Sequence, residues 1–169
     1  EEAPEQNKIV GEETPQILTI SGRSKEILDQ FIDRYHNWVG EHQEMNLADF
    51  CYTVNTGRGH YSHRIAMIVK DREDLLVKLD HLAKKGAHRE EEMGIYYSSH
   101  KVVNANKKKR QPGEISEGER RKLGKEAAKY LQEFIEEGQA MDKVAEIYTR
   151  GATVDWQKLY TDQKRQKLH

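Results

Sequence analysis

The chain has 169 residues, of which 36% are hydrophobic and 34% are charged, a polar balance that fits one compact domain with a modest core and much solvated helix. Its 28 Lys and Arg residues are balanced by 29 Asp and Glu residues, so no overall basic field favours nucleic acid or an anionic membrane. A single cysteine excludes an internal disulfide and predicts a reducing, cytoplasmic setting. No apolar run reaches the roughly 20 residues needed to cross a bilayer.

The first part of the chain predicts a small sheet packed by helices. Residues 1–15 are polar and contain two prolines, so we expect a linker there. Short β-prone runs predict strands at 16–21, 63–70 and 94–98. Apolar residues recur at helical spacing after three good N-cap residues, Ser24, Asn46 and Asp71. Gly57 stands where a left-handed cap would end the second of these helices.

The second part predicts a basic loop followed by helices. Residues 104–115 hold the run Lys107 to Arg110 and then Pro-Gly, which indicates a mobile loop. Ser116 and Glu119 form a capping-box pattern that opens a long helix, and a shorter helix follows, so that 116–151 is a helical insert. The final stretch, 152–169, contains one more helical turn near Trp156.

Taken together, these elements predict an α/β fold of the α+β type. The order β, α, α, β, α, β over residues 16–103 indicates a sheet of about three strands packed by helices, and 116–151 follows it as a helical appendage. The apolar face of the long helix either docks on its own domain or pairs with another chain, and the pattern leaves both open. Its candidate interaction residues are Leu123, Ala127, Tyr130, Leu131, Phe134, Ile135 and Met141.

The residues that could carry chemistry favour structural roles. Cys51 lies between aromatic residues on an amphipathic helix with no evident base, so we expect a small buried hydrophobe. His60 and His63 have a spacing that is weak as a zinc signature, and histidines at a strand start often cap backbone groups. We therefore predict no catalytic, cofactor-binding or metal-binding residue in the chain.

Two other readings stay open at this point. The cluster Lys107 to Arg110 could bind nucleic acid, although the chain is neutral overall and no aromatic residues interleave with the cluster. The second open hypothesis is an unrecognised enzyme whose catalytic residues are Cys51 or the histidines. We predict neither nucleic acid nor membrane as a partner.

Two sequence motifs stand out in combination. The first motif is carried by Leu47, Ala48, Asp49, Tyr52, Gly57, Arg58, His63 and Arg64. The second motif is carried by Tyr148, Gly151, Val154, Asp155, Trp156, Leu159 and Tyr160. Together they resemble the motifs of the linkers in modular polyketide synthases. In the same family, the opening Glu1-Glu2-Ala3-Pro4 is similar to the end of a ketosynthase domain, and 16–21 is similar to the first strand of the linker that follows.

In the commoner members of that family a complete acyltransferase domain separates the two motifs. Here residues 102–139 are too few for one, and no GHSxG-type nucleophile elbow is present. The resemblance therefore implies the trans-acyltransferase type, in which this segment is a non-catalytic flanking subdomain, also called an acyltransferase docking domain. Its implied partners are the adjacent ketosynthase, a free acyltransferase, and the same helical insert of a neighbouring synthase.

Overall fold

The computed structural model describes residues 14–57 and 59–161. Most of the expected linker at 1–15, including Glu1 to Pro4, lies outside the described residues, as do Arg58 and residues 162–169. No helix in the described ranges is long and apolar enough to span a membrane.

A three-stranded antiparallel sheet forms the centre of the molecule. Its strands are β1 (Gln16–Gly22), β2 (His63–Val69) and β3 (Ile95–Ser99), and β2 lies between the other two. The register pairs Ile20 with Ile65, and Ile65 with Tyr97. Side chains of a strand alternate between faces, and residues 64–67 are all buried, so both faces of the sheet are covered.

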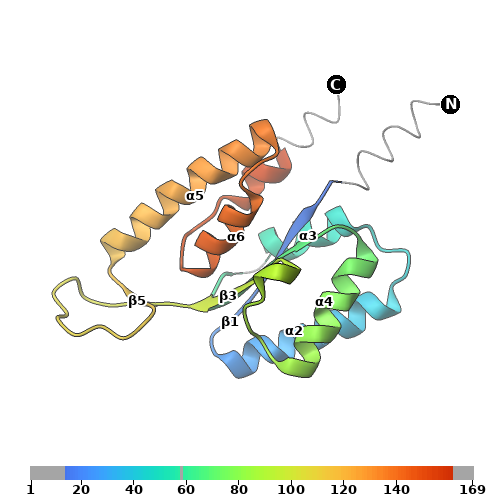
Figure 1. The fold of residues 1–169 in the computed structure, drawn as a ribbon, viewed down its shortest axis with the longest axis horizontal. Coiled ribbons are helices and arrows are strands. Elements are labelled where there is room, and N and C mark those ends of the chain that lie inside the picture. The colour runs from blue at the N-terminus through green and yellow to red at the C-terminus, as the bar shows by residue number, and fades with distance from the viewer. Residues whose placement is uncertain (1–13, 58, 162–169) are drawn as a thin grey trace.

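Three helices cover the first face. They are α2 (Lys25–Glu41), α3 (Leu47–Gly57) and α4 (Arg72–Lys85), and Figure 1 shows α2 and α4 together on one side of the sheet. Ser24 and Asp71 cap α2 and α4 as predicted, since each side chain accepts a backbone N–H of the first turn. The buried core on this face includes Leu18, Leu28, Ile32, Cys51, Ile65, Met67, Leu75, Leu79 and Ile95.

The helices that we predicted as an appendage cover the second face. They are α5 (Glu117–Glu137) and α6 (Met141–Thr149); α6 contacts β2 and β3, and α5 packs against α6 (Figure 1). This core is formed by Ile17, Ala66, Tyr96, Leu131, Val144, Ala145, Tyr148, Trp156 and Leu159. Burying a large apolar side chain stabilises a fold by roughly 1.5–3 kcal/mol, so this layer contributes substantially to the stability of the sheet.

The basic loop is flanked by a short strand pair that the sequence did not reveal. β4 (Lys101–Val102) and β5 (Glu114–Ile115) are parallel, and the loop between them projects from the molecule (Figure 1). The capping box at the start of α5 is confirmed: Ser116 Oγ accepts from Glu119 N at 3.1 Å, and Glu119 Oε1 accepts from Ser116 N at 2.8 Å.

The α/β fold class is therefore confirmed, and so are the predicted strands and helices of the first part. One local expectation was wrong. Gly57 is the last residue of α3 and does not have a positive φ, so it is not a left-handed cap. Gly138, which ends α5, does have the left-handed conformation: its φ is 72° and its N–H donates to Phe134 O.

Candidate functional site

Two segments that are far apart in the chain meet at the second face of the sheet. The first runs through α3 into β2, and the second runs from the end of α6 to residue 160. They carry the two motifs singled out in the sequence. Polar side chains of the first segment bond directly to atoms of the second. We call this contact the motif junction and define it by its five polar side chains, Asn55, His60, Arg64, Tyr148 and Tyr160.

Arg64 is the central cation of the motif junction, and only 2% of it is exposed. Its Nη1 donates to the carbonyl oxygens of Tyr148 at 2.9 Å and Ala152 at 2.7 Å, and its Nε donates to Tyr61 O at 2.7 Å. The guanidinium also lies over the Tyr148 ring, 4.6 Å from its centroid. The last carbonyls of a helix lack intrahelical partners, so this side chain satisfies acceptors at the end of α6.

His60 joins the same site as a neutral imidazole. Its Nε2 is 2.9 Å from the carbonyl oxygen of Asn55, which can only accept, so Nε2 carries the proton. Its Nδ1 then accepts from the Tyr148 hydroxyl at 2.5 Å. Burial lowers the pKa of His60, with Arg64 adding to the effect, and burial raises the pKa of Tyr148 to about 12. Both groups therefore stay uncharged near neutral pH.

Asn55 links α3 to β1 and to the C-terminal segment. Its Oδ1 accepts from both the N–H and the hydroxyl of Thr19, at 2.9 and 2.7 Å. Its Nδ2 donates to Ile17 O at 2.9 Å and to the Tyr160 hydroxyl at 2.7 Å. Asn55 is 1% exposed, and a buried amide with both ends bonded fixes the register between these elements.

Aromatic contacts complete the motif junction. Tyr148 and Trp156 meet edge to face with centroids 5.6 Å apart, and Tyr52 meets Tyr160 in the same way at 5.1 Å. Trp156 and Leu159 are buried in the second core, to which Val154 adds a partly buried side chain. The second motif is thus a packing motif in this structure.

Gly151 allows the chain to turn sharply at the end of α6. Its φ is 119°, and a Cβ there would lie 2.9 Å from the His100 ring. Only glycine fits both conditions. Asp155 then begins the last helical turn, where its Oδ1 accepts from Lys158 N at 3.3 Å.

The residues that open the first motif position α3. Asn46 Oδ1 accepts from Asp49 N at 2.9 Å, which confirms the predicted N-cap. Leu47 packs against the first core, Ala48 is half-buried, and Asp49 is exposed. None of these three side chains belongs to the motif junction.

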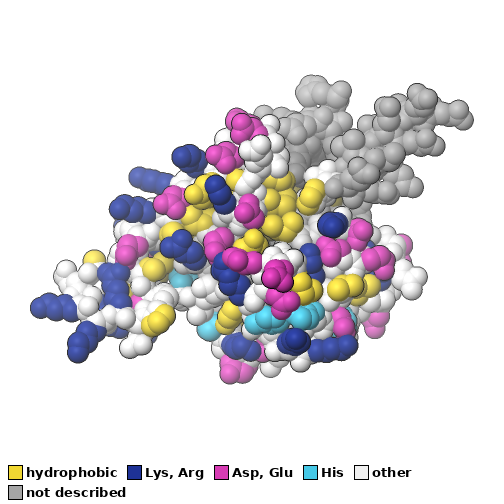
Figure 2. All heavy atoms as spheres, viewed as in Figure 1, with side chains coloured by type: hydrophobic (Ala, Val, Ile, Leu, Met, Phe, Trp, Pro, Cys, Tyr) yellow, Lys and Arg dark blue, Asp and Glu magenta, His cyan; other side chains and the backbone are white. Residues whose placement is uncertain are grey.

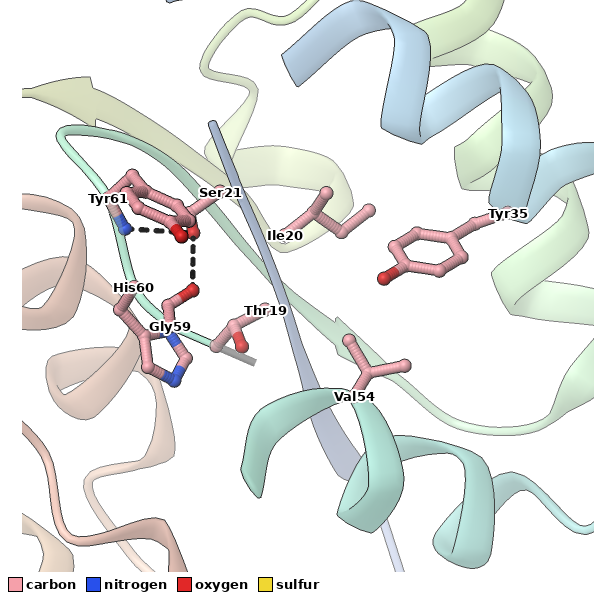
Figure 3. Close-up of a pocket in the computed structure, with 8 residues that line it drawn as sticks. All are labelled: Thr19, Ile20, Ser21, Tyr35, Val54, Gly59, His60 and Tyr61. Atoms are coloured by element: carbon pink, nitrogen blue, oxygen red, sulfur yellow. Dashed lines mark hydrogen bonds between the residues drawn. The ribbon is translucent and has the colours of Figure 1, made fainter. Parts of the chain in front are cut away.

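A small cavity lies beside the motif junction, between β1, α2, α3 and the loop before β2. Figure 3 shows Thr19, Ser21 and His60 on one side of β1 and Tyr35 and Val54 on the other. Its volume is about 20 Å³, which is room for about one water molecule. A cavity of this size cannot hold an organic substrate.

A wider cleft of about 490 Å³ lies where the β4–β5 loop passes the ends of β2 and β3. His63 lines it, and its Nδ1 is 3.4 Å from the Tyr97 hydroxyl. His63 therefore lies outside the motif junction, although it belongs to the first sequence motif. The remaining lining residues are Ser62, Ser99, His100, Lys101, Val102, Gln111, Pro112, Gly113 and Glu114.

Cys51 is fully buried in the first core, and burial raises the pKa of its thiol. Nucleophilic chemistry needs an accessible thiolate, so these surroundings give the hypothesis of an unrecognised enzyme no support.

The basic loop is partly neutralised by its own neighbours. Lys107 Nζ bonds to Glu114 at 2.8 Å, and Arg110 pairs with Glu119. Lys108 and Lys109 are exposed. Two of the four cations of the loop are already paired, so few charges remain for contacts with phosphate groups, and none of the described residues adds support for nucleic-acid binding.

The candidate interaction residues of the helical insert fall into two groups. Leu123, Ala127 and Leu131 are buried against the chain's own core, with exposures of 9%, 0% and 2%. The partly exposed group consists of Tyr130, Phe134, Ile135 and Met141. Figure 2 shows hydrophobic side chains gathered over α6 and the adjoining end of α5. Among these candidates, only the partly exposed side chains can contact another chain.

Comparison with known proteins agrees with the sequence motifs. Residues 16–79 match the family described as CurL-like, PKS C-terminal. Over 145 residues, 85% of this chain, the sequence is 25% identical to polyketide synthase PksR of Bacillus subtilis (strain 168). The chain is homologous to polyketide synthases. It spans only 5% of the length of PksR, so it corresponds to a small segment of that protein.

The fold recurs inside solved ketosynthase chains. One is the ketosynthase from module 6 of the bacillaene synthase from Bacillus subtilis 168, with a TM-score of 0.62 and 23% identity. Another is the ketosynthase from module 1 of the bacillaene synthase from Bacillus amyloliquefaciens FZB42, with a TM-score of 0.63 and 20% identity. Each match covers 85% of this chain and 23% of the solved chain. The fold described here therefore occurs as one part of these ketosynthase chains.

Sequence reasoning missed the central role of Asn55, and it expected His60 to cap a backbone group, as its bond to Asn55 O does, without identifying the Tyr148 partner. A signal for Asn55 was present, because it lies one turn after Cys51 and beside Val54 on the buried side of α3. A polar residue in that position needs buried partners. Those partners come from β1 and from residue 160, so only the tertiary structure identifies them.

Proposed function

We propose that this chain is a non-catalytic scaffold segment of a trans-acyltransferase polyketide synthase, where it braces an adjacent ketosynthase in the cytoplasm. The motif junction carries the proposal. From residue 103 to the second motif, where the commoner family members carry an acyltransferase, lie only the β4–β5 loop, β5, α5 and α6, and the motif segments bond directly to one another. The described residues thus form a closed structural unit with no acyltransferase inserted in it.

Bracing follows from the way this unit is built. A buried network of charge-assisted and neutral hydrogen bonds fixes three layers in one arrangement. A rigid unit of this kind can hold the surface of a neighbouring domain at low entropic cost. Homology to polyketide synthases and the recurrence of the fold within ketosynthase chains support a ketosynthase as that neighbour.

The bracing proposal can be tested on the ketosynthase that precedes the chain in its parent protein. We expect this ketosynthase to melt at a higher temperature when the chain is attached than when it ends before residue 16. Equal melting temperatures for the two lengths would contradict the proposal. The attached Arg64→Met variant, which loosens the motif junction, should give an intermediate melting temperature.

We further propose that the partly exposed face of α5 and α6 joins neighbouring synthases side by side. Its apolar side chains are Tyr130, Phe134, Ile135 and Met141, and their partner would be the same face of a second copy. Deleting 116–151 cannot test this, because it would expose Ile17, Ala66 and Tyr96 of the second core. Point substitutions are therefore required.

Met141→Lys is the most suitable substitution, because Met141 is partly exposed at the start of α6 and belongs to no buried core cluster of the described residues. A matched control is Val77→Lys, which removes an apolar side chain that is 60% exposed on α4. Sedimentation of the ketosynthase-linked chain should show association that Met141→Lys weakens and Val77→Lys does not. Equal effects of the two variants would contradict lateral association through this face.

Docking of a free acyltransferase is the remaining proposal for a partner. Titration of the acyltransferase into the labelled chain should shift resonances on one contiguous surface. The absence of any shift at millimolar concentration would contradict docking to this segment by itself.

A further inference from the structure

A cluster of metal-binding side chains lies away from the motif junction, at the end of α4. His81 comes from the last turns of α4, His88 from the turn that follows it, and Glu90 from the residue before the short 3-10 helix η1 (Glu91–Met93). Their ligand atoms all lie within 4.8 Å of one another. Both Nε2 atoms are 2.9 Å from the same oxygen, Glu90 Oε1.

The cluster is accessible from solvent. The side chains of His81, His88 and Glu90 are 21%, 30% and 35% exposed. Figure 2 shows histidine side chains reaching the surface of the viewed face. An ion can therefore enter without any opening of the core.

Bonds around the cluster orient its ligands in advance. His88 Nδ1 is 2.8 Å from Gly86 O, and because a carbonyl can only accept, Nδ1 carries a proton. The lone pair of a neutral His88 is then on Nε2, which faces the cluster. Histidine ligands of metals are held in this way by a backbone carbonyl on the other ring nitrogen.

The backbone also fixes the carboxylate. Glu90 N donates to Ile95 O at 2.9 Å, and Ile95 N donates to Glu90 O at 3.0 Å. Gly86, with φ at 82°, ends α4 and turns the chain back so that His88 faces His81. Three ligands from separate points of the chain are thereby held on rigid backbone.

The contact between His88 and Glu90 needs a positive charge that these two side chains do not supply when the imidazole is neutral. A neutral Nε2 of His88 and Glu90 Oε1 both present lone pairs to each other, so a cation between them is needed to make the contact favourable. Nearby Arg89 does not supply it, since its guanidinium bonds to Glu91 and Glu146. Either an extra proton on His88 or a metal ion would supply the positive charge between these two atoms.

We propose that His81, His88 and Glu90 bind one Zn²⁺ ion, with water completing the shell. Two imidazole nitrogens and one carboxylate oxygen are a ligand set that zinc prefers. Bonds of about 2.0–2.1 Å to zinc place tetrahedral ligands roughly 3.3 Å apart, so the 2.9 Å separations must widen by only a few tenths of an ångström. The ion would clip the end of α4 to the segment that enters β3.

The test uses the 169-residue chain without a histidine tag, stripped of metal and titrated with zinc chloride by calorimetry. We expect one equivalent to bind and to raise the melting temperature. His88→Ala and Glu90→Gln should each weaken zinc binding by at least about tenfold. Cobalt(II) should give the visible absorption of a four-coordinate site, which the variants lose.

His36→Gln is the matched control, because His36 on α2 also faces a carboxylate, Asp80 at 3.5 Å, but with no second imidazole in the pair. This variant should bind zinc like the parent chain. Circular dichroism of each variant establishes that it is folded. The proposal is overturned if zinc does not bind at millimolar concentration, if His36→Gln weakens binding as much as His88→Ala, or if His88 resonances respond to pH but not to zinc.

Discussion

Replacing Arg64 with methionine tests the motif junction most directly. Methionine is similar in length but donates no hydrogen bond, so the carbonyl oxygens of Tyr148 and Ala152 lose the donor that they share. The Tyr148 carbonyl keeps its bond from Gly151 N at 3.1 Å. The cation over the Tyr148 ring is lost as well. The end of α6 should therefore detach from β2 more readily, while the first core is left intact.

The magnitude follows from the bonds that disappear. Three bonds are lost, to the carbonyl oxygens of Tyr61, Tyr148 and Ala152. A hydrogen bond to a charged group contributes roughly 1.5–3 kcal/mol, so three of them contribute about 4.5–9 kcal/mol. Removing a buried charge also removes its desolvation cost, so we expect a smaller net loss, about 3 kcal/mol. For a chain of this size, that loss lowers the melting temperature by about 6–12 °C.

Equilibrium unfolding in urea, followed by circular dichroism and by tryptophan fluorescence, measures this loss. Trp156 is buried beside Tyr148 and reports on the motif junction. The control is Arg34→Met, which removes an exposed guanidinium lying over the Phe31 ring on α2 and should change stability by less than about 0.5 kcal/mol. A loss below about 1 kcal/mol for Arg64→Met would refute the reasoning.

Three further predictions concern single residues. Ser116→Ala removes the capping box of α5 and should cost about 1 kcal/mol in urea unfolding, whereas an unchanged midpoint would contradict the role of the cap. Ala140 has a φ of 72°, so Ala140→Gly should relieve strain and raise stability by up to about 1 kcal/mol; a loss of stability would contradict this. Burial lowers the pKa of His100 to about 4, so the unfolded chain binds the proton first and stability should fall as the pH drops from about 6.5 towards 4. His100→Gln should make that fall shallower, and an unchanged slope would count against the assignment.

Much of the local structure is determined by the sequence itself. The caps at Ser24, Asp71 and Ser116 act through residues three positions away, so they can be recognised without any tertiary contact. Short β-prone runs and helical spacing likewise predict the three strands of the central sheet and the helices, but not the β4–β5 pair. The two family motifs also identify the segments that meet, because their residue types are specific in combination.

Only the tertiary structure decided what those segments do to one another. Arg64 and Ala152 are 88 positions apart, and Asn55 and Tyr160 are 105 apart, so no local pattern pairs them. Local sequence also could not assign a partner to the apolar face of α5. Its helical spacing was compatible with docking on its own domain and with pairing with another chain. In the structure α5 packs against α6, and Leu123, Ala127 and Leu131 are buried within their own chain. Burial depends on which surfaces meet and not on the order of residues within one helix.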